Sequence, residues 1–446
     1  SGLDLAIAVG VLVAADELPP EAAEGLGFVA ELGLDGRLRP VPGVAPMVMA
    51  MLAAQPELRP VVALESHGEA YGITIASAAS GVTDSGGVPL VRVAGNLSEL
   101  VSAMRGEQPW PDTPDLCAGG RDTAVRHSAP DLADVKGQPA ARLALELSAA
   151  GGHHLLFVGP PGAGKTMLAE RLPGLLPPLE PNEVLEATMV HSAAGVRLPG
   201  GGLVAHPPFR APHHSSTLVS LVGGGSSSMR PGEISLASRG VLFLDELGEF
   251  APAALDALRQ PLEDGVVRVA RARTSATLPA HFLLVAATNP CPCGGGAPGD
   301  CQCDEGARFR YLRRLSGPLL DRFDLRVAVT KPDVDELMGA GEGESTAIVA
   351  VRVRAARQRS LQRIGILPSA IPGARLDELA PMSPPARELL RRQLEANLLT
   401  GRGFHRVRRV ARTLADLDGE HELVSDAHVA TALALRVRLR VDGRGR

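Results

Sequence analysis

Residues 155–166 read LLFVGPPGAGKT, an apolar run that leads into a glycine-rich turn and then into Lys165 and Thr166. From Gly159 onward this stretch fits the pattern G-x-x-x-x-G-K-[ST]. Such a turn needs glycines because its backbone N–H groups must point inward around phosphate oxygens, and side chains would block that approach. The apolar run Leu155–Val158 is typical of a buried strand, and the chain after the turn opens a helix whose N-terminus favours an anion. The stretch therefore predicts a phosphate-binding loop in an α/β fold.

Each position of this loop has an expected role in binding ATP and Mg²⁺. The lysine ammonium supplies a point charge to the β- and γ-phosphates, and the threonine hydroxyl ligates Mg²⁺. Lysine occurs only at positions 136, 165 and 331, and arginine carries the remaining positive charge. The predicted nucleotide-binding residues are Gly159, Pro160, Pro161, Gly162, Ala163, Gly164, Lys165 and Thr166.

Length and composition indicate an ordinary globular protein with more than one domain. The 446 residues are enough for two or three domains, and 45% of them are hydrophobic while 21% are charged. The net charge of −5 excludes a chain-wide positive field, so any surface that binds nucleic acid must be local. The longest apolar stretch, Leu5–Ala15, is too short to cross a bilayer and lacks the basic start of a signal peptide. We expect a cytoplasmic protein with no membrane partner.

Changes of pattern along the chain predict its domains. Short strand-like and helix-like segments alternate over residues 1–103, and a proline-rich linker follows over 104–131. Residues 132–330 show a βαβ pattern with fully buried strands, and residues 331–446 carry apolar residues at helical spacing. The chain starts in the middle of an apolar helical pattern, so we expect it to begin inside a domain.

Polar residues that follow two further buried strands complete one half of an ATP site. The strand-like run Val241–Leu244 ends in Asp245 and Glu246, which are expected to hold Mg²⁺ and to polarise the attacking water, respectively. The next run ends in Asn289, which would orient water beside the γ-phosphate. The alternatives are an acidic cap of a strand end and an ordinary turn asparagine.

Two arginines are candidates for contacts with the γ-phosphate. Arg322 follows a proline-containing loop and lies between acidic residues, as expected of an arginine supplied to the ATP site of a neighbouring subunit. A surface salt bridge is the alternative. The helical segment from Gly401 to Arg412 is dense in arginine, and Arg402 is the first choice for a residue that reaches the γ-phosphate within its own chain.

The ordered set of strand, phosphate loop, acidic pair, asparagine and arginine resembles the AAA+ ATPases, in the branch that holds magnesium chelatase and the MCM helicases. Four further stretches resemble the YifB/ComM family of magnesium-chelatase-like ATPases. They are FRAPHH at 209–214, RPGEISL at 230–236, LDALRQPLED at 255–264 and ATNPCPCG at 287–294. The resemblance runs from the first residue to about residue 439.

The resemblance implies an AAA+ core with a parallel sheet, a C-terminal helical lid and an N-terminal Lon-protease-like α+β domain, of which this chain holds the second half. It implies a hexameric ring that drives branch migration or helicase-type remodelling of DNA in recombination or natural transformation. In the Lon-like region Asp4 and Ala45 occupy the positions of the peptidase serine and lysine, so no Ser–Lys dyad is present.

Two other functions stay open on the sequence. A motor subunit that drives Mg²⁺ insertion into a porphyrin would share the ATP-site motifs. The Lon-like region and the cysteine-rich loop argue against that alternative. A scaffold that binds ATP only to assemble is disfavoured by the intact Asp245, Glu246 and Arg322.

Four cysteines form a C-x-C-x₇-C-x-C arrangement, and a glycine-rich loop between the pairs can bend them toward one point. Cytosolic cysteines grouped in this way more often bind zinc than form disulfides, although reduced thiols without metal and a redox disulfide are alternatives. A closed site of four cysteines would be tetrahedral and structural. The candidate Zn²⁺ ligands are Cys291, Cys293, Cys301 and Cys303.

Apolar and basic residues alternate from Gly265 to Thr274, as in a two-stranded hairpin. In the related MCM rings a hairpin before the asparagine strand points into the central pore. Arg268, Arg271 and Arg273 are therefore candidates for non-specific contacts with the phosphates of branched or single-stranded DNA. A solvated hairpin without a ligand is the alternative.

Overall fold

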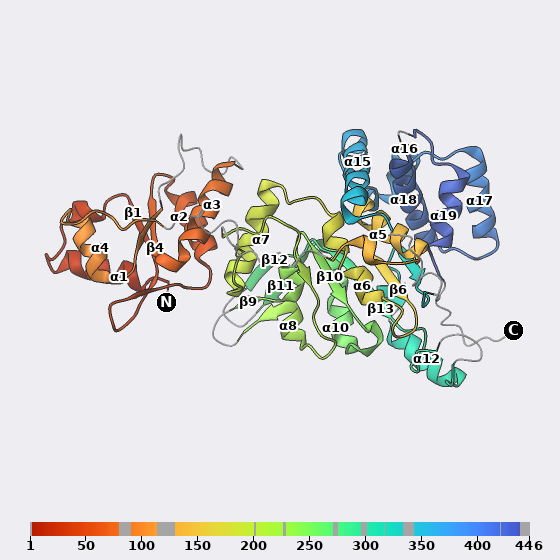
Figure 1. Ribbon diagram of the computed structural model, residues 1–446, viewed down its shortest axis with the longest axis horizontal. Helices are drawn as coiled ribbons and strands as arrows, with labels where there is room; N and C mark the ends of the chain where they lie inside the picture. The colour runs from red at the N-terminus through yellow and green to blue at the C-terminus, as the bar shows by residue number, and fades with distance from the viewer. Residues whose placement is uncertain are drawn as a thin grey trace.

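A central parallel sheet organises the larger part of the molecule (Figure 1). The computed structural model describes residues 2–79, 91–113, 130–199, 202–225, 229–270, 275–295, 301–315, 317–332, 343–419 and 421–437. Within these residues five strands pair in the order β14-β6-β13-β10-β7, and every pair is parallel. The strands are β6 (Leu155–Val158), β7 (Phe209–Arg210), β10 (Val241–Leu244), β13 (Leu283–Thr288) and β14 (Leu325–Ala328).

Numbered by their appearance along the chain, these strands have the order 5-1-4-3-2. Parallel strands need crossover connections, which place helices on both faces of the sheet. All four residues of β6 are buried, and they alternate between two hydrophobic clusters: Leu155 and Phe157 in one, Leu156 and Val158 in the other. A strand covered on both faces therefore reads as a continuous apolar run, which is why the sequence revealed it.

The helices of the ATPase-like core surround this sheet. Helix α5 packs against β14 and the C-terminal helices, while α7 extends from the core toward the N-terminal part of the chain (Figure 1). A capping box fixes the start of α7, because the Glu180 carboxylate accepts from the backbone and the Glu183 carboxylate accepts from Glu180 N–H. The core helices are α5 (Pro139–Gly151), α6 (Lys165–Ala169), α7 (Pro181–Ala194), α8 (Leu218–Val222), α9 (Glu233–Leu236), α10 (Pro252–Ala257), α11 (Arg259–Asp264), α12 (Glu305–Arg314) and α13 (Gly317–Leu320).

The C-terminal part is helical and shares one hydrophobic cluster with α5 and the sheet. Its longer helices each begin at a serine or threonine whose hydroxyl accepts a hydrogen bond from the backbone three residues later. Such caps satisfy one of the free N–H groups of the first turn. The helices of this part are α15 (Thr346–Ile364), α16 (Leu376–Leu379), α17 (Pro384–Glu395), α18 (Gly401–Asp418) and α19 (Asp426–Ala434). The capping residues of the four longer helices are Ser345, Ser383, Thr400 and Ser425.

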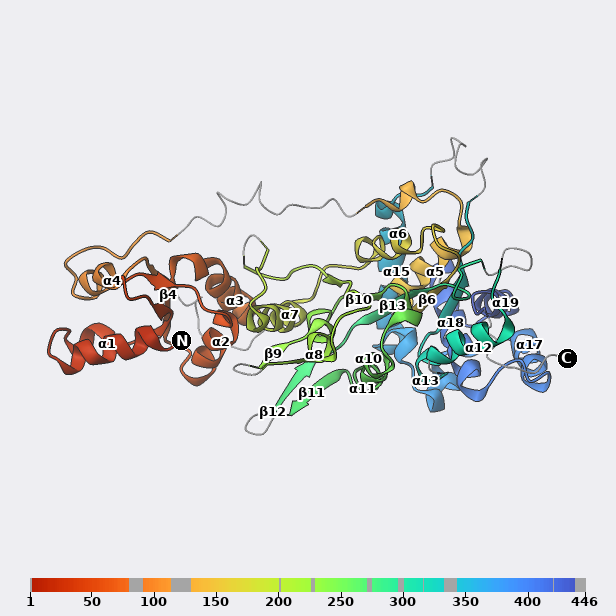
Figure 2. The ribbon, with the colours of Figure 1, turned by 90° about the horizontal axis from the view of Figure 1, so that it is seen from below.

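The N-terminal part forms a separate α/β layer. It lies at the opposite end of the long axis from the C-terminal helices (Figures 1 and 2). Its parallel three-stranded sheet has the order β1-β4-β5, and its core includes Leu185 of α7. The Ser192 hydroxyl of α7 donates to Glu69, so α7 joins the two parts. The elements are α1 (Asp4–Ala14), β1 (Leu26–Val29), β2 (Glu31–Leu32), β3 (Leu38–Arg39), α2 (Val44–Ala54), β4 (Arg59–Ala63), α3 (His67–Ala79), β5 (Arg92–Ala94) and α4 (Leu97–Met104).

Two small antiparallel sheets lie beside the main sheet. Strands β8 (Gly223–Gly224) and β9 (Arg230–Pro231) form one, and β11 (Val266–Ala270) and β12 (Ser275–Pro279) form a hairpin. In Figure 2 the hairpin extends from the core, away from the C-terminal helices.

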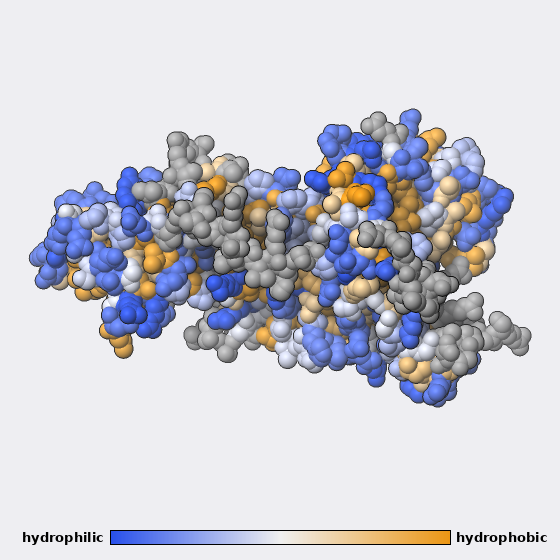
Figure 3. All heavy atoms as spheres, viewed as in Figure 1, coloured by the Kyte–Doolittle hydropathy of each residue, from blue (hydrophilic) through white to orange (hydrophobic). Residues whose placement is uncertain are grey.

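The visible face in Figure 3 is mainly hydrophilic, with apolar side chains showing beside α15, where Ile348 and Val351 are 54% and 57% exposed. Among the described residues, no helix combines the length and the apolar character that crossing a membrane requires.

The predicted α/β class with a parallel sheet and a helical C-terminal region is confirmed. Two local expectations need correction. The expected helix after the loop is present but has only five residues, and a 3₁₀ helix begins at Leu172. The hairpin places its second strand at 275–279 rather than before Thr274. The linker prediction falls partly on residues 114–129, which lie outside the described residues, and the domain boundaries and the Lon-like assignment stay predictions.

Candidate functional site

The phosphate-binding loop follows β6 at the carboxyl end of the sheet, where ligands of open parallel sheets bind. Gly162 and Gly164 have φ values of +75° and +86°, in the left-handed region that glycine adopts without strain. Gly159 is required for a different reason: a Cβ atom there would lie 2.0 Å from the carbonyl oxygen of Val329. Two glycines of the motif thus permit the turn, and Gly159 permits close packing against the residue that follows β14.

Lys165 is 8% exposed and points back into the loop. Its Nζ donates to the carbonyl oxygens of Gly159 at 2.8 Å and Pro160 at 2.9 Å, and to Oδ1 of Asn289 at 3.1 Å. Burial lowers the pKa of Lys165, and the nearby carboxylates of Asp245 and Glu246 oppose that shift. The ammonium therefore lies between the loop and the predicted asparagine.

Thr166 and Asp245 face each other as a pair of oxygen ligands would. The Thr166 hydroxyl donates to Oδ2 of Asp245 at 2.6 Å, and Oδ1 of Asp245 accepts from the backbone N–H of Glu246 at 2.9 Å. Mg²⁺ prefers oxygen ligands and is commonly held by one carboxylate together with substrate phosphates. The pair has the chemistry and the proximity that such an ion requires.

Glu246 follows β10 with φ at +50°, an uncommon conformation for a residue with a side chain. Its carboxylate Oε2 lies 3.4 Å from Nδ1 of His214. The ring of His214 in turn lies against that of His213, with centroids 4.0 Å apart and the ring planes tilted by 35°. The sequence placed Glu246 after a strand but gave no signal for its histidine neighbour, because His214 lies 32 residues earlier in the chain.

The phosphate loop, the acidic pair and Asn289 line one cavity of about 410 Å³. All the predicted residues from Pro161 to Thr166 line it, together with the acidic pair and Asn289, and Met167 and Thr288 add to the lining. The cavity is therefore built from the carboxyl ends of β6, β10 and β13. Its only cationic lining residue among the described residues is Lys165.

Arg322 and Arg402 lie together on a different surface and do not line this cavity. Arg322 follows α13 and pairs with Glu263 of α11. Nη1 of Arg402, in the first turn of α18, lies 3.8 Å from Oδ2 of Asp321. Burial, and then the nearby charges of Arg406 and Arg402, lower the pKa of Arg322. Arg402 does not line the cavity of the phosphate loop, and its expected contact with the γ-phosphate within the same chain stays a prediction.

A buried ionic network holds the turn that carries Arg322. Asp324 accepts from Arg406 of α18 at 2.5 Å and lies 3.2 Å from Nδ1 of His153. Burial alone would raise the pKa of Asp324, but the His153 hydrogen bond and the Arg406 charge hold it well below its ordinary value. Arg406 also donates to the carbonyl oxygen of Arg322 at 3.0 Å. The sequence analysis missed this network, whose members come from three distant segments.

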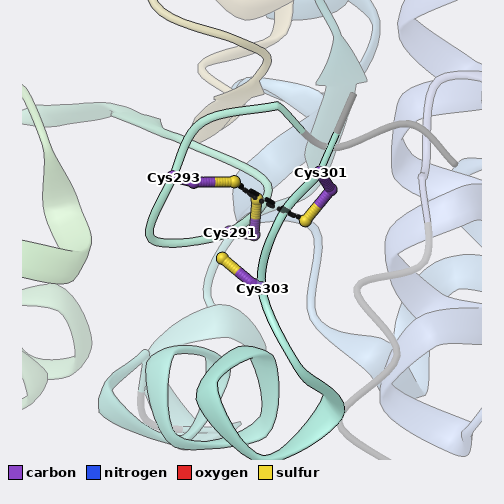
Figure 4. A group of neighbouring side chains, drawn as sticks. All are labelled: Cys291, Cys293, Cys301 and Cys303. Carbon is purple, nitrogen blue, oxygen red and sulfur yellow. Dashed lines mark hydrogen bonds between the residues drawn. The ribbon is translucent and has the colours of Figure 1, made fainter. Parts of the chain in front are cut away.

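The four predicted cysteines converge, and their side chains point toward one another (Figure 4). All four sulfur atoms lie within 4.8 Å of one another, and Cys291 Sγ is 3.4 Å from the sulfurs of both Cys293 and Cys301. A tetrahedral zinc ion with bonds of about 2.3 Å holds its sulfur ligands about 3.8 Å apart. The cluster therefore fits one Zn²⁺ ion without a large rearrangement.

The surroundings of the cluster favour a thiolate at two of its cysteines, whereas at Cys303 a backbone hydrogen bond lowers the pKa but hydrogen bonds with the neighbouring sulfurs and burial raise it to about 12. Backbone N–H groups of Gly295 and Gln302 lower the pKa of Cys293 to about 6. The guanidinium of Arg308 in α12 donates from Nε to Cys301 Sγ at 3.2 Å, which lowers the pKa of that thiol as well. Donors to sulfur of this kind are usual around bound thiolates.

The β11–β12 hairpin is described except at its tip. In β11, Val267 and Val269 are buried while Arg268 is exposed and pairs with Asp264 at 3.0 Å. Arg271 and Arg273, the other candidates for DNA contacts, lie outside the described residues. The structure thus places one of the three arginines on the exposed face of the hairpin.

Three family models match the chain in separate segments. The models for "Magnesium chelatase, subunit ChlI" and its C-terminal region match residues 131–337 and 343–436, and a third, "Subunit ChlI of Mg-chelatase", matches residues 1–65. A distant similarity reaches the DNA replication licensing factor mcm6 of Dictyostelium discoideum, which is 25% identical over 39% of this chain and 16% of its own length.

Relatives match almost the whole chain. An uncharacterised protein of Mycobacterium tuberculosis is 46% identical over 97% of this chain and 83% of its own length. Competence protein ComM of Haemophilus influenzae is 40% identical over 98% of the chain and 83% of its length. YifB of Escherichia coli is 38% identical over 97% of the chain and 81% of its length. This chain therefore belongs to the ComM/YifB family of magnesium-chelatase-like AAA+ proteins.

Proposed function

We propose that this protein is an ATP-driven motor that works as a hexameric ring and remodels branched or single-stranded DNA. The observation that carries the ring is the separation of the two halves of the ATP site. The cavity holds the phosphate loop, the acidic pair and Asn289, whereas Arg322 and Arg402 lie on another surface of the same chain. A neighbouring subunit whose Arg322 reaches this cavity would complete the site.

In this arrangement each residue has a distinct task. Lys165 contacts the β- and γ-phosphates, and Thr166 and Asp245 hold Mg²⁺, which neutralises phosphate charge when bound. Glu246 accepts a proton from the attacking water, and Asn289 orients that water beside the γ-phosphate. Arg322 of the next subunit stabilises the charge that develops on the transferred phosphoryl group, and Arg402 contacts the γ-phosphate from its own chain.

The DNA substrate is supported by the hairpin and by the relatives. Exposed arginines on a hairpin are suited to contact a phosphate backbone without sequence preference. The relative from Haemophilus influenzae is named a competence protein, and the distant relative from Dictyostelium discoideum is named a replication licensing factor. Base stacking contributes little to the proposal, since the chain holds one tryptophan and two tyrosines.

The four cysteines, we further propose, hold a structural Zn²⁺ ion. The support is geometric: the four sulfur atoms are close enough to one another to occupy the corners of one coordination tetrahedron, and no position is left for a water ligand. The Mg²⁺ of the ATP site is separate from this ion, because it needs oxygen ligands.

The test compares ATP hydrolysis with and without forked DNA, and with a porphyrin and a partner-protein mixture. We expect forked DNA to raise the hydrolysis rate several-fold and strand displacement to accompany it. Lys165→Ala is the control for contaminating ATPases, since it removes the phosphate contact. A rate that forked DNA leaves unchanged would overturn the DNA proposal, and stimulation by the porphyrin mixture would favour a chelatase motor.

A further inference from the structure

The cysteine cluster lies directly against the phosphate-binding loop. Gly294, between Cys293 and the second cysteine pair, packs so closely on Pro161 that a Cβ atom at Gly294 would lie 2.5 Å from Cδ of the proline ring. Gly294 has φ at +80°, so the same turn that joins the two cysteine pairs also requires glycine. Pro161 lines the ATP cavity, which makes this contact a direct link between the two sites.

The cluster is also joined to the asparagine at the end of β13. Cys291 is 1% exposed and follows Asn289 with only one residue between them. The Oδ1 atom of Asn289 in turn accepts a hydrogen bond from the Lys165 ammonium at 3.1 Å. The position of Cys291 therefore limits where the Asn289 side chain can lie relative to the loop.

Helix α12 provides a third connection. It begins two residues after Cys303, and its Arg308 bonds to Cys301. Its buried Tyr311 shares a hydrogen bond of 3.2 Å with Thr288, and a Cβ atom at Gly248 would lie 2.7 Å from the tyrosine ring. Tyr311 thus packs between the segment that follows Glu246 and the segment that precedes Asn289.

We propose that the metal-bound cysteine cluster is a positioning element of the ATP site. Four thiolates held by one ion fix Gly294, Cys291 and the start of α12 relative to one another. Gly294 packs on Pro161, Cys291 lies two residues after Asn289, and α12 carries Tyr311, which bonds to Thr288. Without the ion, four thiolates this close repel one another or take up protons, and the loop that supports the phosphate-binding turn is no longer held in place. Loss of the metal then weakens ATP binding. This inference rests on the proposed zinc ion and on ATP binding, and not on the DNA substrate.

The experiment measures zinc content and ATP affinity on the same purified full chain. Plasma mass spectrometry is expected to find about one zinc per chain in the wild type. The double variant Cys301→Ser/Cys303→Ser should lose the zinc and bind a fluorescent ATP analogue at least tenfold more weakly. Cys117→Ser is the matched control, because it removes a cysteine outside the cluster, and it should keep both zinc and affinity. Circular dichroism reports whether each variant folds.

Two further measurements separate positioning from a general loss of fold. Gly294→Ala should keep the zinc and still weaken ATP binding, since its Cβ would push against Pro161. Removal of zinc from the wild type by a chelator should weaken ATP binding, and added Zn²⁺ should restore it. Unchanged ATP affinity in the folded zinc-free protein overturns the inference. If the wild type binds ATP but no zinc, both this inference and the zinc proposal are overturned. If it binds zinc but no ATP, both this inference and the proposed function are overturned.

Discussion

Glu246 shows at the residue scale how the site differs from an ordinary strand end. Its left-handed backbone, with φ at +50°, costs free energy that the surrounding structure must offset. Such conformations cluster where a side chain must be aimed, and here the carboxylate is directed beside His214 rather than toward Lys165. The backbone strain supports the proposed catalytic role, and a capped strand end would not require it.

His154 leads to a prediction about stability and pH. Its Nδ1 accepts from the backbone N–H of Leu284 at 3.0 Å, and burial lowers the pKa of this histidine to about 4. The unfolded chain binds a proton near the ordinary pKa of 6.5, so between pH 6.5 and 4 the unfolded state holds more protons and stability falls as the pH falls. Because the ring is partly exposed, we expect His154 to account for a loss of about 2 kcal/mol.

Urea unfolding at a series of pH values between 7.5 and 4.5 measures this effect. His154→Gln should flatten the dependence of the unfolding midpoint on pH, since an amide cannot take up the proton. His206→Gln, at an exposed position, is the matched control and should keep the wild-type slope. Equal slopes in the wild type and His154→Gln would show that the pKa of this histidine does not differ between the folded and unfolded states, which contradicts the prediction.

At the scale of single elements, the β11–β12 hairpin has one face for the core and one for solvent. Val267 and Val269 anchor it to the hydrophobic cluster on one face of the main sheet, so the period of two in the sequence reflects burial. The exposed face carries Arg268, whose ion pair with Asp264 is a surface contact of small energy. That pair can open at little cost when a phosphate takes its place.

The arginines of the hairpin lead to a prediction about how the affinity for DNA depends on the salt concentration. Changing Arg268, Arg271 and Arg273 together to alanine removes up to three phosphate contacts, so the slope of log affinity against log salt should fall by about two to three units. Fluorescence anisotropy of labelled single-stranded DNA over a range of salt concentrations measures the slope. The double variant Arg391→Ala/Arg392→Ala removes exposed arginines of α17 and should keep the slope. A triple variant with the wild-type slope would exclude the hairpin as the DNA contact.

Helix α18 joins the C-terminal helical part to the surface that carries Arg322. Arg406 binds both the Asp324 carboxylate and the Arg322 carbonyl oxygen, and Thr413 of the same helix bonds to His153 at 2.7 Å. Helix α18 is therefore bonded both to the turn that carries Arg322 and to the residues before β6. The arginine-rich pattern of this helix was visible in the sequence, but its members have separate tasks, and burial of Arg412 was not apparent from the pattern.

At the scale of the whole molecule, the separated halves of the ATP site predict complementation between inactive subunits. Lys165→Ala and Arg322→Ala should each abolish hydrolysis. When they are mixed in equal amounts, about a quarter of the interfaces in a randomly mixed ring combine an intact Lys165 with an intact Arg322. Steady-state ATPase measurements should then show partial recovery.

A second mixture is the control for this experiment. Lys165→Ala and Glu246→Gln alter the same half of the site, so no interface in their mixture is intact, and no activity should return. Recovery in both mixtures, or in neither, would contradict an ATP site shared between subunits.

The sequence alone was sufficient for the phosphate loop, the acidic pair, Asn289 and the strands that precede them. These features are short, and their chemistry depends on neighbours within a few residues, so local patterns reveal them. The convergence of four cysteines was also predictable, because only a short glycine-rich loop separates the pairs.

Only the tertiary structure decided which of these features meet. It placed Arg322 and Arg402 away from the cavity of their own chain, set Gly294 against Pro161, and joined Asp324 to His153 and Arg406. These contacts link residues far apart in sequence, and they follow from the packing of helices on both faces of the sheet. No local pattern encodes that packing, because it depends on how the whole hydrophobic core closes.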